Sequence, residues 1–276
     1  MEVQVCDFRS DSFKNDFINS LTNTGFAVIT NHGIPFEMIH MAQQDWRMFF
    51  LNRQSYKDTF INHEDNNMGY KGFGSEKAVG ATIADLKEFF HFKPFAAIPP
   101  ETSTVTNMLY YQLEDLGMVL LNTIDSYLDQ NTKFRDACLD SDNTLFRTLY
   151  YPSMKFEIEQ KMGAVRAAAH EDINFITLLV AASAPGLEVM DKSGKWHKVP
   201  HEENSVVVNV GDMLQLATNG AFKSTTHRVV NAEDTKSDRI SMPLFIHPHS
   251  ETILAPGITA KQFLDERIAE IYGVGK

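Results

Sequence analysis

Short β-type segments, separated by Gly, Asn and Pro turns, make up most of the chain from Leu145 onward. In one of them Val206, Val208 and Val210 share a face, a period of two that is typical of strands. Strands this short and this closely spaced favour a barrel or a double sheet. The predicted strands are 145–151, 170–180, 187–190, 196–199, 205–210, 214–217, 226–231 and 239–246.

Helices are predicted where apolar residues recur at helical spacing. These segments are 12–24, a segment beginning near Pro35, 105–128 and 259–272. Gly25 can end the first helix, Thr259 and Gln262 can form a capping box before the last, and Gly273 can end it. We expect the longest helix to back the sheet through its apolar residues at 109, 113, 116, 120, 121, 124 and 128.

Two residues of types that bind metal ions, His170 and Asp172, lie at the start of the predicted strand 170–180. On a strand His170 and Asp172 would point to one face and Glu171 to the other. A third ligand must come from elsewhere, and His227 is the best candidate. Two His and one carboxylate on one side of an ion form the facial triad of non-haem Fe(II) oxygenases, with the other side open.

A second pair, Arg239 and Ser241, lies on the apolar pattern of residues 239–246 and shares a face by the same period of two. A guanidinium fork beside a hydroxyl suits a carboxylate held by two hydrogen bonds. A metal triad followed by a carboxylate clamp indicates a keto-acid co-substrate.

The chain resembles the Fe(II)/2-oxoglutarate-dependent dioxygenases of the isopenicillin N synthase-like family, and is most similar to its compact bacterial members. The similarity runs through most of the chain in the family's order, so it is specific. The matching stretches are 25–34, 150–152, 170–172, 208–215, 218–220, 224–229 and 239–241.

The resemblance implies a mainly β fold with flanking helices, built on a distorted double-stranded β-helix, or jelly roll. It implies an N-terminal dioxygenase region, residues 1–100, packed on the jelly-roll core of residues 101–276 as one compact unit. His170, Asp172 and His227 would be both the metal ligands and the catalytic residues.

The same resemblance implies Fe(II), O2, 2-oxoglutarate as co-substrate, and ascorbate as a reductant. The far carboxylate of 2-oxoglutarate would meet Arg239 and Ser241, and Tyr151 would hydrogen-bond it. Leu149 stands where plant-type members often carry Asn, so that polar contact is absent. The reaction would release succinate and CO2 while a small-molecule substrate is hydroxylated, desaturated or cyclised.

Composition restricts the partners. The net charge of −11 argues against nucleic acid or an anionic membrane surface as the main partner. No apolar run approaches the ~20 residues of a membrane helix, and no signal peptide is evident. Cys6 and Cys138 form neither a metal-type pair nor a disulfide framework, which fits a cytoplasmic location. The oligomeric state stays open.

Two other functions agree with the same residues. The first is an iron oxidase that does not consume 2-oxoglutarate, like isopenicillin N synthase and the aminocyclopropane-carboxylate oxidases. The second is a jelly-roll module that binds metal without turnover, which has little need of both a triad and a clamp. The substrate is not readable from a motif; residues 62–95, including His91, and Arg147 are candidate contacts.

Overall fold

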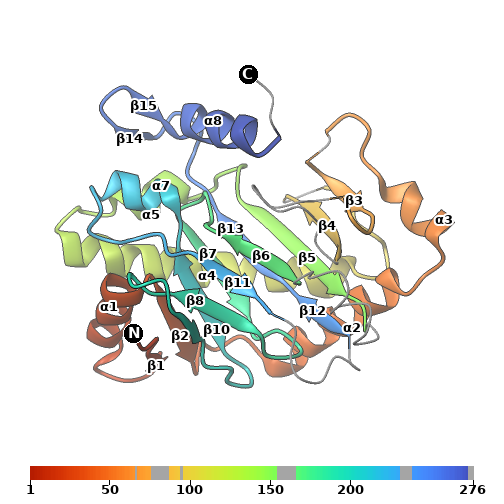
Figure 1. The fold of residues 1–276 in the computed structure, drawn as a ribbon, viewed down its shortest axis with the longest axis horizontal. Coiled ribbons are helices and arrows are strands. Elements are labelled where there is room, and N and C mark those ends of the chain that lie inside the picture. Colours follow the sequence, from red (N-terminus) through yellow and green to blue (C-terminus); the bar gives the residue numbers. More distant parts are fainter. Residues whose placement is uncertain (66, 76–86, 94–95, 154–165, 231–237, 273–276) are drawn as a thin grey trace.

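Two β-sheets form the centre of the protein in the computed structural model, which describes residues 1–65, 67–75, 87–93, 96–153, 166–230 and 238–272 (Figure 1). In spatial order the nine-stranded sheet contains β1 (Val5–Asp7), β2 (Phe26–Thr30), β10 (Val206–Val210), β7 (Ile176–Val180), β13 (Pro243–Ile246), β5 (Leu145–Tyr151), β4 (Glu88–Phe92) and β3 (Gly69–Lys71), with β12 (Arg239–Ser241) also paired to β5. The four-stranded sheet contains β6 (Ala167–His170), β11 (His227–Val229), β8 (Leu187–Met190) and β9 (Trp196–Lys198). A separate hairpin joins β14 (Ile253–Ala255) to β15 (Ile258–Thr259).

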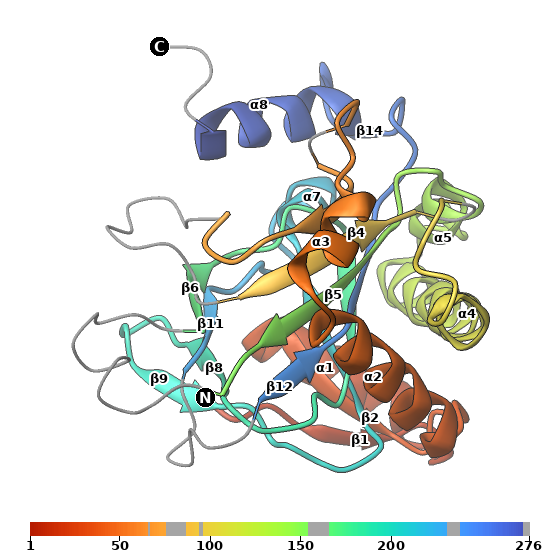
Figure 2. The ribbon, with the colours of Figure 1, turned by 90° about the vertical axis from the view of Figure 1, so that its right-hand side faces the viewer.

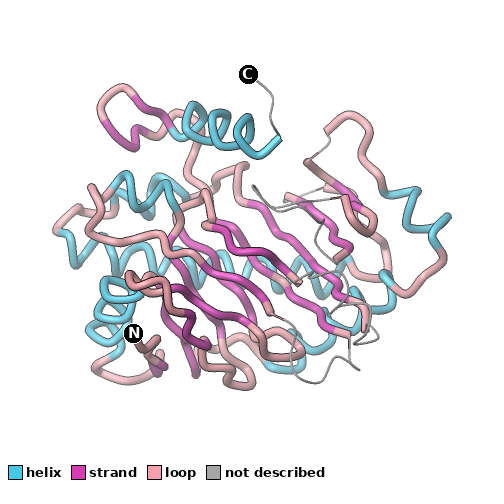
Figure 3. The backbone as a smooth tube through the Cα atoms, viewed as in Figure 1, coloured by secondary structure: helices cyan, strands magenta, loops and turns pink. Residues whose placement is uncertain are grey.

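The helices lie outside these sheets, as Figure 3 shows. They are α1 (Phe13–Thr24), α2 (Phe36–Phe50), α3 (Gln54–Lys57), the 3-10 turn η1 (Asp58–Phe60), α4 (Ser103–Leu128), α5 (Lys133–Cys138), α7 (Asp212–Ala217) and α8 (Ala260–Tyr272). Figure 2 shows the smaller sheet facing the larger one on one side, and α4 and α5 on the other. This arrangement confirms the expected jelly roll with flanking helices. None of the helices that the structure describes is long and apolar enough to cross a bilayer.

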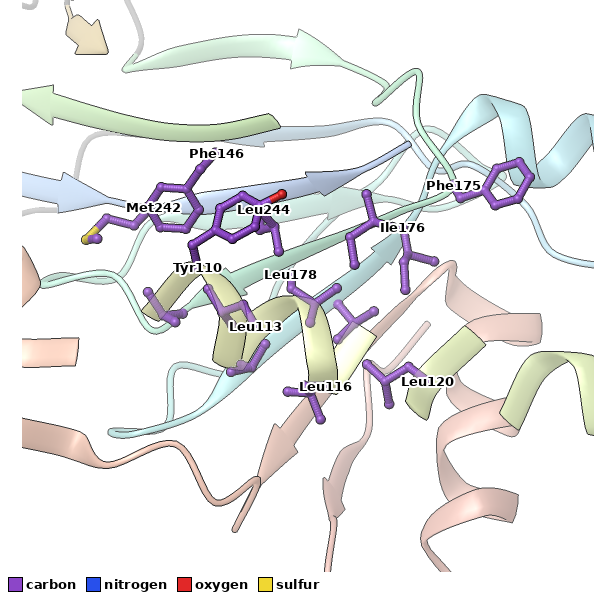
Figure 4. Close-up of a cluster of buried hydrophobic side chains, with 14 of the residues drawn as sticks. Tyr110, Leu113, Leu116, Leu120, Phe146, Phe175, Ile176, Leu178, Met242 and Leu244 are labelled. Carbon is purple, nitrogen blue, oxygen red and sulfur yellow. The ribbon is translucent and has the colours of Figure 1, made fainter. Parts of the chain in front are cut away.

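Helix α4 backs the larger sheet, as its apolar spacing predicted (Figure 4). Its inner face buries leucines along the whole length, among them Leu109, Leu113, Leu116, Leu120 and Leu121. These meet the even-numbered side of β7 and β13, where Leu178, Leu244 and Ile246 are fully buried. The odd-numbered residues of the same strands therefore face the smaller sheet. This phase decides which side chains can reach a site between the sheets.

Several predicted elements match the structure closely, and three do not. The segment 170–180 is not one strand: β6 ends at His170, and β7 begins only at Ile176. The predicted strand 214–217 is wrong, because these residues belong to helix α7. The segment 239–246 divides at Met242 into β12 and β13.

The first hundred residues contribute directly to the larger sheet. Strand β2 pairs with β10, joining Phe26 to Asn209, and β4 pairs with β5. Gly25 ends α1 in the left-handed conformation, at φ 74°, as expected of a helix-terminating glycine. A Cβ at this position would lie 2.4 Å from Thr225 Oγ1, so the turn also packs against the segment that leads into β11.

The capping box at the start of α8 is present. The Thr259 N–H donates to Gln262 Oε1 at 2.9 Å, and the Gln262 N–H donates to Thr259 Oγ1 at 3.2 Å. Gly273, expected to end this helix, lies outside the described residues, as do residues 66, 76–86 and 94–95 of the candidate contact region 62–95.

Candidate active site

Three predicted metal ligands converge between the two sheets. His170, the last residue of β6, pairs directly with His227, the first residue of β11. Asp172 Oδ1 lies 3.8 Å from Nε2 of each histidine. The ligand atoms of all three residues lie within 4.8 Å of one another.

Asp172 reaches this position from a loop, not from a strand as predicted. Backbone hydrogen bonds to the start of α7 hold the loop: Asp212 N–H donates to Asp172 O at 2.7 Å, and Met213 N–H donates to Ile173 O at 3.0 Å. Asp172 is buried, whereas Glu171 is exposed and accepts a hydrogen bond from Thr226 Oγ1 at 2.6 Å. The predicted choice between the two carboxylates therefore agrees with the geometry, although the strand argument behind it was wrong.

The carboxylate of Asp172 has its two oxygen atoms in different environments. Oδ2 accepts hydrogen bonds from Thr177 Oγ1 at 2.6 Å and from Asn209 Nδ2 at 2.8 Å. Burial raises the pKa of Asp172, but the two imidazoles and these hydrogen bonds outweigh burial and leave the pKa below its usual value. The group is thus ionised at neutral pH, with Oδ1 directed at the two histidines.

Both histidines present Nε2 to Asp172. His170 Nδ1 lies 2.8 Å from Ala168 O, and His227 Nδ1 lies 3.1 Å from Thr225 O, so each Nδ1 carries the proton. The His170 side chain is 42% exposed, yet the protein packed around the imidazole desolvates it and, with His227, lowers its pKa to about 4. The positive charge of Lys87 contributes to the same shift.

This donor set fits a divalent metal ion. Two imidazole nitrogens and one carboxylate oxygen gather within 4.8 Å of one another, and a divalent cation would hold them together as its ligands. Two His and one carboxylate on one side of the centre are the facial triad of non-haem iron sites. The chemistry of the residues therefore matches the ligand set inferred from the sequence.

The predicted carboxylate clamp lies on neighbouring strands of the larger sheet. Arg239 on β12 pairs with Tyr151 on β5, and Ser241 pairs with Leu149. The side chains of Arg239, Tyr151, Ser241 and Leu149 therefore share the face of the sheet that is turned away from α4. Arg239 is only 2% exposed; its Nε–H donates to Ala184 O at 3.0 Å, and its Nη1 has no hydrogen-bond partner among the described residues.

Burial lowers the pKa of Arg239 to about 10, so the guanidinium remains charged at pH 7. A buried charge with an unused donor is costly unless an anion satisfies it. Tyr151, whose ring centroid lies 5.3 Å from the Arg239 Cζ, and Ser241 are buried beside it. This arrangement fits a carboxylate of a bound small molecule.

Four further polar residues lie near these groups and were not singled out individually from the sequence, although Lys87 falls within the candidate contact region 62–95. Thr177 and Asn209 orient Asp172, but only their strand register brings them there. Arg166 and Lys87 are buried, with Arg166 Cζ 5.9 Å from the Tyr151 ring centroid. Neither belongs to a recognisable spacing pattern, so no sequence signal marks them.

Comparison with known proteins agrees with this geometry. Residues 143–248 match the model of the 2OG-Fe(II) oxygenase superfamily, and residues 4–112 match the N-terminal model of the non-haem dioxygenases in morphine synthesis. Gibberellin 2-beta-dioxygenase of Phaseolus coccineus is 30% identical over 275 residues, covering 92% of this chain and 79% of that protein.

Two crystal structures share the fold over nearly the whole chain. A candidate oxygenase from Shewanella oneidensis is 37% identical, with a TM-score of 0.88 and full coverage of both chains. A full-length Neurospora crassa protein in complex with alpha-KG and thymine is 25% identical, with a TM-score of 0.82, covering 97% of this chain and 96% of that one. The chain belongs to the 2OG-Fe(II) oxygenase superfamily and is a non-haem dioxygenase that requires Fe(II), 2-oxoglutarate and O2.

Proposed function

We propose that His170, Asp172 and His227 bind the Fe(II), and that Arg239 and Ser241 bind the far carboxylate of 2-oxoglutarate with help from Tyr151. The observation that carries this assignment is the convergence of three metal-ligand atoms within 4.8 Å of one another. The buried Arg239 fork, with Nη1 lacking a partner among the described residues, supports the assignment of the clamp.

When bound, the iron supplies oxidative chemistry in which 2-oxoglutarate and O2 yield succinate and CO2 while a C–H bond of the substrate is oxidised. The protein orients the metal ligands and surrounds them with buried hydrogen-bonding groups. Thr177 and Asn209 aim Asp172 Oδ1 at the metal, and the backbone carbonyls at Ala168 and Thr225 fix the tautomers of the two histidines. Hydroxylation, desaturation and cyclisation all use this same arrangement.

The substrate in this proposal is a small molecule. The Neurospora crassa structure holds thymine together with alpha-KG, and another relative is a gibberellin dioxygenase. We treat residues 1–100 and 101–276 as one working unit, because β2 and β4 pair with strands of the later part. The exclusion of nucleic acid and the cytoplasmic location remain predictions from charge and cysteine content.

The test is co-substrate turnover by the purified protein with Fe(II), ascorbate, O2 and 2-oxoglutarate. We expect slow formation of succinate without any added substrate, and none from the Asp172→Ala variant. Isothermal titration of the Zn(II)-loaded protein with 2-oxoglutarate gives a second readout that does not depend on turnover. If wild-type protein holds the metal but neither binds nor consumes 2-oxoglutarate, the oxidase or the binding module replaces this proposal.

A further inference from the structure

A row of inward side chains crosses the larger sheet next to the metal ligands. Strand register aligns Asn209 on β10 with Thr177 on β7, and Thr177 with Phe245 on β13. Phe245 is paired in turn with Leu145 on β5. All four have the phase that faces the smaller sheet. Because the Cβ atoms of cross-strand partners lie about 4.5–5.5 Å apart, Phe245 is the immediate neighbour of the threonine that donates to Asp172.

Burial decreases along this row. Asn209 and Thr177 are buried, whereas Phe245 and Leu145 are only half-buried. Leu244, on the opposite side of β13, is fully buried against α4 (Figure 4). By contrast, Phe245 and Leu145 pack against none of the apolar clusters that the described residues form. They therefore make an apolar surface beside the metal ligands that a ligand can cover.

A histidine follows this apolar pair at the end of β13 that is nearer to the Asp172 loop. The Phe175 N–H donates to Ile246 O at 3.0 Å, so the pairing of β13 continues into the segment between Asp172 and β7. His247 comes next and is half-buried. Its Nδ1 lies 3.2 Å from the carbonyl oxygen of Phe245, so Nδ1 carries the proton and Nε2 presents a lone pair.

The Nε2 atom of His247 is available to a ligand. None of the described residues donates a hydrogen bond to it, and the atom is not fully buried. The protein around the imidazole desolvates it and, with Lys93, lowers the pKa of His247 to about 4, although the Phe245 carbonyl and Asp172 oppose the shift. The ring is thus neutral at pH 7, and Nε2 is an acceptor of hydrogen bonds.

We propose that His247 determines specificity by accepting, at Nε2, a hydrogen bond from an N–H or O–H group of the substrate, whose apolar part lies on Phe245 and Leu145. The substrate class is a small apolar molecule with a neutral donor group. Small-molecule sites commonly combine an apolar surface with a few polar atoms that fix orientation. The inference rests on the proposed function, because the register that places Phe245 beside Thr177 presents a C–H bond of this molecule to the iron triad.

The experiment uses full-length protein loaded with Zn(II), which is inert to redox chemistry, and saturated with 2-oxoglutarate. The probes are pairs that differ only in the donor group: phenol and anisole, indole and its N-methyl derivative, benzamide and its N,N-dimethyl derivative. Binding is followed by the thermal midpoint, which a ligand of the folded state raises. We expect the donor member of at least one pair to bind about three- to tenfold more tightly than its methylated partner, as one neutral hydrogen bond allows.

Nuclear magnetic resonance reads the proposed hydrogen bond directly. Long-range proton–nitrogen correlation spectra of protein with isotope-labelled histidine distinguish the two tautomers, and the signals of His247 are those that disappear in His247→Leu. We expect the proton on Nδ1 in the protein without probe. The Nε2 signal should then shift when a donor probe is added and stay in place with its methylated partner.

Variants assign the preference to this ring. His247→Leu should abolish the preference for donor probes, whereas His247→Gln, whose amide oxygen can replace Nε2 as the acceptor, should keep part of it. His249→Leu is the matched control, because His249 is exposed and its Nε2 lies 2.8 Å from Leu139 O; the preference should be unchanged. Urea denaturation of each variant identifies any loss that comes from unfolding.

Three results would overturn the inference. The methylated probes bind as tightly as the donors, or no donor probe binds at millimolar concentration. The folded His247→Leu variant keeps the full preference. The spectra place the proton of His247 on Nε2. Each result remains distinguishable from failure of the proposed function, because binding of Zn(II) and 2-oxoglutarate to the wild-type protein is measured first.

Discussion

Replacing Thr177 with Val tests how the protein holds its anionic metal ligand. Thr177 is buried on β7, and its hydroxyl donates to Asp172 Oδ2 at 2.6 Å. Valine keeps the shape of the side chain and removes the donor. Asn209 continues to donate to the same oxygen at 2.8 Å, so Asp172 keeps one of two orienting bonds.

The expected size of the effect follows from the charge of the acceptor. A hydrogen bond to a charged group contributes about 1.5–3 kcal/mol, and loss of a group that orients a metal ligand typically lowers metal affinity about 10- to 100-fold. Because Asn209 remains, we expect the lower end, about a tenfold rise in the dissociation constant for Zn(II). The free energy of unfolding should also fall, since the bond exists without metal.

The assay is competition for Zn(II) against a chromophoric chelator, together with urea denaturation of the metal-free protein. Thr106→Val is the matched control: Thr106 is buried, accepts a hydrogen bond from Trp46 Nε1 at 2.9 Å, and belongs to α4. The control should lose stability but not affinity for Zn(II). Wild-type Zn(II) affinity in Thr177→Val, with a similar loss of stability, would show that Thr177 supports the fold and not the ligand.

Three further predictions concern the rest of the site. Arg239→Met should weaken 2-oxoglutarate binding about 100-fold, since it removes a charged partner, while Zn(II) affinity is retained; unchanged titration curves would exclude Arg239 as the clamp. Asp172→Ala should lose the metal on dialysis, whereas Glu171→Ala should change metal affinity by no more than about fivefold, and the reverse pattern would require a new ligand set. Gly211→Ala should lower the free energy of unfolding by about 1–3 kcal/mol, because its Cβ would lie 2.2 Å from Asn174 O; an unchanged urea midpoint would contradict this.

Elements with a clean hydrophobic period were predictable from the sequence. The predicted strand 145–151 corresponds to β5, and the helix predicted over 105–128 corresponds to α4, which begins at Ser103. In both elements one face is buried against the core. Because that face requires apolar residues, they recur in the sequence at the spacing of a strand or a helix. The roles of Gly25 and of the Thr259–Gln262 pair were also predictable. A left-handed helix end favours glycine, and the free N–H groups at a helix start favour side chains that accept hydrogen bonds.

The errors arose where long-range hydrogen bonds override a local pattern. Leu214 and Leu216 alternate as in a strand, but residues 212–217 form the helix whose first N–H groups bond to Asp172 O and Ile173 O. The same bonds draw Asp172 out of a strand. A short apolar run does not distinguish a strand from a helical turn, and the partner that decides lies about forty residues away in sequence.

The metal ligands and the carboxylate clamp could be predicted from the sequence, but the residues that support them could not. His170, Asp172, His227, Arg239 and Ser241 follow from residue chemistry and spacing, and the structure brings the first three together. Their supporting groups depend on strand register, which pairs Thr177 with Asn209. Lys87, buried just before β4, has no pattern that separates it from an ordinary surface lysine.

The pairing of β2 with β10 has a consequence for biosynthesis. Phe26 lies opposite Asn209, so strand β2 cannot complete its pairing until a strand about 180 residues later in the chain has been made. Contacts between such distant segments slow folding, and an incomplete chain leaves the edge of β2 open to other chains. The Asn209 that orients Asp172 belongs to the late strand. Assembly of the metal centre is thus tied to completion of the sheet. A ribosome-bound chain that stops before β10 lacks both the pairing of β2 with β10 and the side chain of Asn209.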